Sequence, residues 1–111
     1  MKLQVSELEN GIRLIALNGK LDSGGVYAVE MDFQHHCSGH KQRILVDISN
    51  VSYISSMGIP MLVNTAKLVT GKGGRMALLS PQKNVMDVLE MVGVSRVVPI
   101  YFALHSAKLA F

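Results

Sequence analysis

The sequence predicts a single α/β domain over residues 1–111, with a mostly parallel, mixed sheet of about five strands, an N-terminal hairpin and four helices packed on the sheet. Three observations support this. Apolar residues make up 49% of the 111 residues and charged residues 17%, which suits one ordinary core and argues against disorder. An Asn-Gly pair separates two short apolar segments near the start. After it, strand-like runs alternate with helical periods in the order β β α β α β α β α.

The first two strands are expected to form the hairpin. Apolar and polar residues alternate over residues 3–5 and again over residues 12–14, and the turn Glu9-Asn10-Gly11 lies between them. Asn-Gly between apolar segments is a strong signal for a tight hairpin turn. The second strand is expected to end at Asn18-Gly19.

The first helix and the third strand follow. From about Ser23, a candidate N-cap, the apolar period changes to three or four residues, which places one set of side chains on a helix face: Val26, Val29, Phe33 and Cys37. The nearly continuous apolar run from Ile44 to Ile48 is typical of a strand that is buried on both faces.

The remaining elements repeat this alternation. A helix over residues 59–69 has Pro60 in its first turn and is ended by glycines at 71, 73 and 74. A strand over Arg75–Leu79 leads to a helix that opens at Ser80-Pro81, ends near Gly93 and turns four residues inward: Val85, Val88, Leu89 and Val92. A short strand over 97–100 and a short helix over 104–111 complete the pattern.

Composition excludes several classes of protein. No apolar run approaches the roughly 18 to 20 residues that cross a bilayer, so no membrane insertion is expected. The N-terminal segment lacks the apolar core of a secretory signal and carries Glu7 and Glu9, which favours a cytoplasmic location. The lone Cys37 has no partner for an internal disulfide. The net charge is +3, and Lys and Arg are scattered along the chain, so no nucleic-acid partner is expected.

The segment from Ile44 to Val63 is the most informative for function. It reads ILVDISNVSYISSMGIPMLV, in which an apolar strand runs into a polar turn and then into a helix that opens on two serines. A serine at this position is an ordinary N-cap, whose oxygen accepts a backbone N–H, or a phosphorylation switch. The positive end of the helix tolerates a phosphate there, so both interpretations stay open.

Four segments together resemble STAS domains, in particular the bacterial anti-sigma factor antagonists. They are Gly19-Lys20-Leu21-Asp22, then ILVDIS, NVSYISSMGI and GRMALLSP. The resemblance covers essentially the whole chain and implies a STAS-like fold. In that family a serine in the turn before the second helix is phosphorylated by a partner serine/threonine kinase that is also an anti-sigma factor, and a PP2C-type serine phosphatase reverses the modification. The unphosphorylated form binds the kinase and thereby frees the sigma factor.

Carried over residue by residue, the resemblance implies that Ser56 is the acceptor, with Ser55 as the alternative. Ser55 stands where the family commonly has aspartate, and Met57 where it has a small residue. The residues expected to contact the partner are Asp22, Ser55, Ser56, Met57, Gly58, Ile59 and Met61. The alternative function is a constitutive STAS scaffold subunit of a signalling or transport complex, without phosphorylation.

Other candidate residues favour structural roles. Asp22 ends a strand at a polar turn, where it serves as a turn or cap residue with its carboxylate toward the Ser56 turn. Asp47 is expected near the exposed end of its strand or on backbone donors. The run His35-His36-Cys37 with His40 contains metal-ligand types, but Gly39 interrupts the helix and no metal is expected. The segment 71–74 lacks Walker spacing, and no arrangement typical of catalysis or of a cofactor site occurs.

Overall fold

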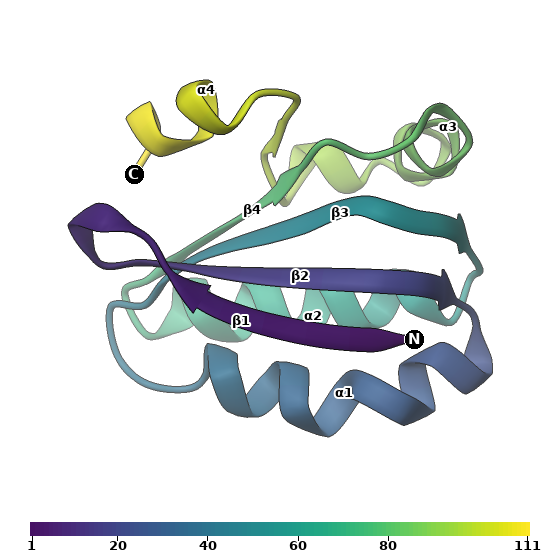
Figure 1. The fold of residues 1–111 in the computed structure, drawn as a ribbon, viewed down its shortest axis with the longest axis horizontal. Helices are drawn as coiled ribbons and strands as arrows, with labels where there is room; N and C mark the ends of the chain where they lie inside the picture. Colours follow the sequence, from purple (N-terminus) through teal and green to yellow (C-terminus); the bar gives the residue numbers. More distant parts are fainter.

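The computed structural model describes all residues 1–111 and has the expected α/β architecture (Figure 1). Its elements are β1 (Lys2–Glu7), a 3-10 turn (Glu9–Gly11), β2 (Ile12–Leu21), α1 (Ser23–Cys37), β3 (Arg43–Ile54), α2 (Gly58–Gly71), β4 (Arg75–Leu79), α3 (Lys83–Met91), a second 3-10 turn (Val94–Arg96), β5 (Ile100–Tyr101) and α4 (Leu104–Leu109). The strand order is β1-β2-β3-β4-β5, with β1 antiparallel to β2 and the other pairs parallel. The predicted element order and mixed sheet are therefore confirmed.

The sheet separates two layers of helices. In Figure 1, α1 and α2 cover one face of the sheet, and α3 and α4 lie over the other. The central strand β3 is buried on both faces, as expected, because Ile44 and Val46 belong to the main cluster of 22 buried residues while Leu45 belongs to a second cluster of five. The predicted inward face of α1 is also buried, with Phe33 fully enclosed. No helix is long and apolar enough to span a membrane.

The N-terminal hairpin is confirmed. Asn10 and Gly11 have φ angles of 63° and 73°, the left-handed values that a tight hairpin turn requires. Arg13 pairs with Glu7 across the hairpin at 2.9 Å, and Lys108 contacts Glu9 at 2.6 Å. The second ion pair lowers the pKa of Glu9 and ties α4 to the turn of the hairpin.

Two strands run further than predicted. β2 continues past Gly19 to Leu21, and β3 continues past Ile48 to Ile54. Between them the parallel register shifts near Ala16 and again after Gly19, so that pairing resumes at Lys20↔Tyr53 and Leu21↔Ile54. These irregularities break the alternation of side chains between faces, which is the signal that a sequence pattern depends on.

Helix and strand ends near the C-terminus also differ from the expectation. α3 begins at Lys83 and not at Ser80-Pro81, because Ser80 adopts φ +56° and donates its N–H to the carbonyl oxygen of Tyr101 at 2.7 Å. Val92 lies beyond the helix and is 54% exposed. Gly93 follows in the left-handed region, as expected of a residue that ends a helix.

The final strand is shorter and later than predicted. It covers only Ile100–Tyr101, while Val97 is 51% exposed after the second 3-10 turn. Val98 is fully buried but forms no strand pairing, so burial alone does not place it in the sheet.

Candidate functional site

The turn between β3 and α2, which consists of Ser55, Ser56 and Met57, lies at the carboxyl end of the parallel strands. In Figure 1 this is the end of the sheet that carries the arrowheads of β2 and β3. The N–H of Ser55 donates to the carbonyl oxygen of Leu21 at 3.1 Å, which joins the turn to the end of β2. Because α1 starts directly after β2 and α2 directly after β3, two helix N-termini share this end of the domain.

Ser55 makes the hydrogen bonds that order the turn before α2. Its Oγ accepts the N–H of Met57 at 3.1 Å and donates to the carbonyl oxygen of Leu21 at 3.4 Å, while its carbonyl oxygen accepts the N–H of Gly58 at 3.0 Å. Its side chain is half-buried. These bonds order the turn that leads into α2 and hold it against β2, whereas Met57, the residue at the N-cap position of α2, makes no side-chain capping bond.

Ser56 is exposed and takes no part in these hydrogen bonds. It stands immediately before the first turn of the 14-residue helix α2, where the helix dipole places roughly half a positive charge. Pro60 in that first turn has no N–H to leave unpaired. The Ser56 hydroxyl is thus free, accessible and in a location that favours a negative charge.

Gly58 is required by close packing. A Cβ built at this position would lie 2.7 Å from the carbonyl oxygen of Leu21 and 3.0 Å from Cγ1 of Ile54. Glycine lets α2 begin in contact with β2 and β3, and this contact presents the preceding serine at the surface.

The other residues expected to contact a partner are divided between surface and core. Met57 is 56% exposed and Ile59 is half-buried. Met61 does not reach the surface, because it is 2% exposed and lies on the core-facing side of α2 with Leu62. Gly58 is buried as well, so neither Gly58 nor Met61 is available for direct contact.

The two aspartates have structural partners. Asp22, and not Ser23, is the N-cap of α1, since its Oδ1 accepts the N–H of Gly25 at 2.8 Å. The hydrogen bond that Asp22 makes is therefore to α1 and not to the Ser56 turn. Oδ1 of Asp47 accepts the N–H of Ser49 at 2.9 Å, which confirms a backbone donor for this carboxylate.

Two residues beside the turn were not identified from the sequence. Lys20 and Tyr53 are register partners on β2 and β3, and both are exposed, Tyr53 by 49%. A strand pattern gave no clear signal here, because two consecutive exposed residues, Ser52 and Tyr53, separate the buried Val51 and Ile54 and interrupt the alternation.

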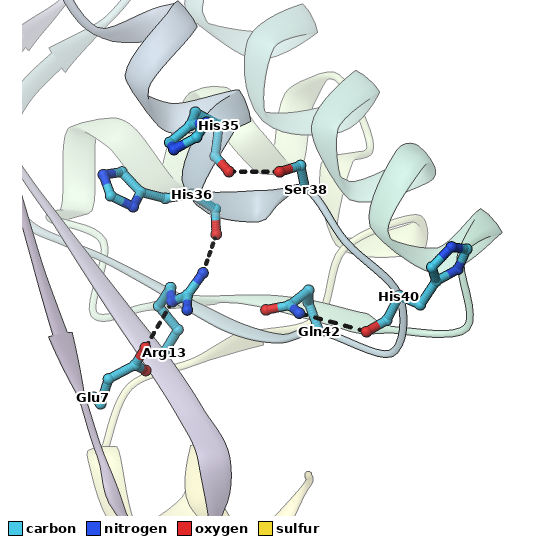
Figure 2. A network of polar contacts seen from close by, with 7 residues as sticks. All are labelled: Glu7, Arg13, His35, His36, Ser38, His40 and Gln42. Atoms are coloured by element: carbon cyan, nitrogen blue, oxygen red, sulfur yellow. Dashed lines mark hydrogen bonds and ion pairs between the residues drawn. The ribbon is translucent and has the colours of Figure 1, made fainter.

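The histidines near Cys37 do not form a metal centre. The rings of His35 and His36 lie 5.4 Å apart at the end of α1, while His40 points away from them on the following loop (Figure 2). The carbonyl oxygen of His36 accepts a hydrogen bond from Arg13 at 2.8 Å. Cys37 is buried, and burial raises the pKa of its thiol to about 12. No three His, Cys, Asp or Glu side chains of the chain lie in an arrangement that could hold a metal ion.

Comparisons with known proteins agree with this fold. An anti-sigma F factor antagonist from Paenibacillus polymyxa is 28% identical over 103 residues, which cover 91% of this chain and 88% of the relative. A STAS-domain anti-sigma-factor antagonist protein from Planctomyces limnophilus aligns with a TM-score of 0.86 at 25% identity, over 97% of this chain and 95% of that one.

Structures of SpoIIAA, an anti-sigma factor antagonist and Bacillus cell fate determinant, share the fold in an unphosphorylated and in a phosphorylated form. The unphosphorylated form aligns with a TM-score of 0.76 at 18% identity, over 96% of this chain and 93% of that one. The phosphorylated form aligns with a TM-score of 0.69 at 16% identity, over 99% of this chain and 100% of that one. The family model for the STAS domain matches residues 5–107. The chain therefore belongs to the STAS domain family.

Proposed function

We propose that this chain is an anti-sigma factor antagonist that binds an anti-sigma factor serine kinase in its unphosphorylated form and is switched off by phosphorylation of Ser56. The observation that carries the proposal is the division of labour between the two adjacent serines. The Ser55 hydroxyl is engaged with the N–H of Met57 and the carbonyl oxygen of Leu21, whereas Ser56 is exposed and its hydroxyl takes part in neither bond. The P. polymyxa relative, an anti-sigma F factor antagonist, supports the class of function.

The same geometry explains why a phosphate fits the protein. A phosphoserine carries a charge of about −1.5 to −2 at neutral pH. Ser56 lies two residues before the start of α2, near the positive end of the helix, and a phosphate on it would not replace either hydrogen bond of the Ser55 hydroxyl. The fold therefore accepts the modification, and the effect falls on the surface.

The effect on a partner follows from the neighbours of Ser56. Met57 follows Ser56 in the chain and Tyr53 lies three residues before it, and these large side chains are 56% and 49% exposed. A kinase that covers this surface must remove water from Ser56. Desolvating a dianion costs several kcal/mol, so the phosphorylated form releases the partner. A PP2C-type serine phosphatase would restore binding, and the exchange would take place in the cytoplasm. The chain itself has no catalytic role in this scheme.

Phosphopeptide mass spectrometry on protein isolated from its native cells tests the switch. Trypsin releases the segment Ile44–Lys67 as one peptide, because it contains no internal Lys or Arg. Phosphate is expected on Ser56 and absent from Ser55 and Ser52. An unmodified peptide under several growth conditions would support the constitutive scaffold instead.

Binding measurements test the consequence. Ser56→Asp is expected to weaken binding to the anti-sigma factor kinase of the same organism by about 100-fold, or about 3 kcal/mol, as measured by isothermal titration calorimetry. Ser56→Ala is expected to bind the kinase as tightly as the wild type. Ser95→Asp is the matched control, since Ser95 is an exposed serine outside the turn. Equal affinity of the Ser56→Asp and Ser56→Ala proteins would rule out charge at Ser56 as the switch.

A further inference from the structure

Cations that are scattered in the sequence meet at the end of the sheet opposite to the Ser56 turn. Arg43 begins β3 and Arg75 begins β4, and the two are register partners in adjacent parallel strands. Lys41 and Lys72 lie on the loops just before these strands, where the N–H of Lys41 donates to the carbonyl oxygen of Lys72 at 2.9 Å. Parallel strands start at the same edge of a sheet, so residues more than 30 positions apart in sequence become neighbours here.

The two loops enclose a shallow hollow of about 350 Å³. Its cationic lining residues are Lys41, Arg43 and Arg75, and we call this hollow the basic cleft. The loops fit closely, because a Cβ at Gly74 would collide with the carbonyl oxygen of Gln42. The cleft is therefore part of the packed fold and not a chance meeting of flexible loops.

Both arginines are held in place without being neutralised. Nη1 of Arg43 donates to the carbonyl oxygen of Asn10 at 2.7 Å, and Nη1 of Arg75 donates to that of Ala110 at 3.0 Å. A guanidinium has five N–H donors, so each arginine retains donors for a second acceptor. Bidentate binding by such a fixed fork is well suited to a carboxylate or a phosphate.

No Asp or Glu lines the basic cleft, and the two glutamates at the hairpin turn are engaged with other cations. Glu7 is paired with Arg13 and Glu9 with Lys108. The three ion pairs of the protein include none of the cations that line the basic cleft. The positive charge of the cleft is consequently available to an external anion.

Lys41 occupies a backbone conformation that does not itself favour lysine. Its φ angle is +54°, in the left-handed region where a non-glycine residue is unfavourable. Glycine adopts this conformation freely, so the backbone gives no reason for a lysine. The side chain lies over the neighbouring loop, with its Cγ 3.5 Å from the Cβ position of Gly73.

We propose that the basic cleft docks an acidic segment of a partner protein, at a surface separate from the Ser56 turn. Asp and Glu carboxylates match the two guanidinium forks and the lysine. A nucleic acid fits less well, because the cleft offers three cations where DNA-binding proteins typically neutralise about 6 to 10 phosphates. The one aromatic residue in the lining, Phe111, is half-buried and packs on the second core cluster, so it is not free to stack on bases.

Fluorescence anisotropy with a fluorescein-labelled octaglutamate peptide at low salt tests the proposal, with octaglutamine as the uncharged probe. Arg43→Gln/Arg75→Gln is expected to weaken octaglutamate binding by about tenfold, because it removes two ion pairs between arginine and glutamate, each as strong as a partly exposed ion pair. Lys41→Gly is expected to weaken it about two- to fivefold while the urea midpoint stays equal or rises, since glycine relieves the backbone. The matched control is Lys2→Gln/Lys83→Gln, which removes the same charge at the opposite end of the sheet and should change affinity by less than about twofold.

Each other outcome overturns the proposal. Absence of octaglutamate binding to the wild-type protein would remove the site. An equal loss of octaglutamate affinity in the Lys2→Gln/Lys83→Gln protein would mean that binding depends on the net charge of the protein and not on the basic cleft. Unchanged octaglutamate affinity of both the Arg43→Gln/Arg75→Gln and the Lys41→Gly proteins would show that the peptide does not bind in the basic cleft. Tighter binding of a labelled 12-nucleotide single-stranded DNA, with the same dependence on Arg43 and Arg75, would identify a nucleic-acid surface instead. None of these results depends on whether Ser56 is phosphorylated, because Ser56 follows the other end of β3.

Discussion

Replacing Gly58 by alanine is expected to destabilise the protein and displace the Ser56 turn. A Cβ at Gly58 would lie 2.7 Å from the carbonyl oxygen and 2.8 Å from Cγ of Leu21, and 3.0 Å from Cγ1 of Ile54. Favourable contacts between such atoms lie at about 3.5 to 4.0 Å. The nearest obstacle is backbone, so α2 and β2 must separate by several tenths of an ångström. That separation also stretches the bond of Ser55 to Leu21.

The magnitude follows from two opposing terms. Overpacking of this kind costs about 1 to 3 kcal/mol. The higher helix propensity of alanine offsets at most about 1 kcal/mol, and less at the first position of a helix. The expected net loss is about 1 to 2 kcal/mol in the free energy of unfolding. With a urea m-value of about 1.5 kcal/mol/M, the midpoint falls by roughly 0.7 to 1.3 M. Far-UV circular dichroism is the suitable probe, because the chain has no Trp.

Gly71→Ala is the matched control within the same helix. Gly71 is the last residue of α2, and a Cβ there would meet no atom within 4 Å. Its substitution is expected to leave the midpoint unchanged or to raise stability by up to about 1 kcal/mol. A Gly58→Ala protein as stable as the wild type, or an equal loss in Gly71→Ala, would refute the packing argument.

Two further predictions concern the residues around α1. Asp22→Ala is expected to cost about 1 kcal/mol in urea unfolding, because the N–H of Gly25 loses its cap, while Asp22→Asn keeps most of the stability; an equal loss in both variants would mean that capping is not its role. Cys37 is expected to resist alkylation by iodoacetamide at pH 8, since a pKa of about 12 leaves only about one thiol in ten thousand ionised, against roughly a quarter in the unfolded chain. Because the folded pKa is raised, the contribution of the neutral thiol to stability is complete below about pH 8.5 and is lost as pH rises toward 12, which a Cys37→Ala comparison of urea midpoints at pH 8 and pH 10 checks. Rapid alkylation in the native state would contradict the burial of the thiol.

The sequence by itself determined the order of the elements and the place of the candidate serine turn before α2. Periodicity is a local property, so the helix face from Val26 to Cys37 and the doubly buried run from Ile44 to Ile48 could be identified without neighbours. The Asn10-Gly11 turn and the paired serines before Gly58 were likewise identified from adjacent residues.

Only the tertiary structure decided how these parts act together. The roles of Ser55 and Ser56 differ because Leu21, 34 residues before Ser55, accepts a hydrogen bond from Ser55. Met61 does not belong to the exposed part of the predicted contact surface, because the rotation of α2 against the sheet turns its side chain into the core. Arg43 and Arg75 become partners because β3 and β4 pair in a particular parallel register. Each of these outcomes depends on contacts between residues that are distant in sequence, which short-range spacing does not encode.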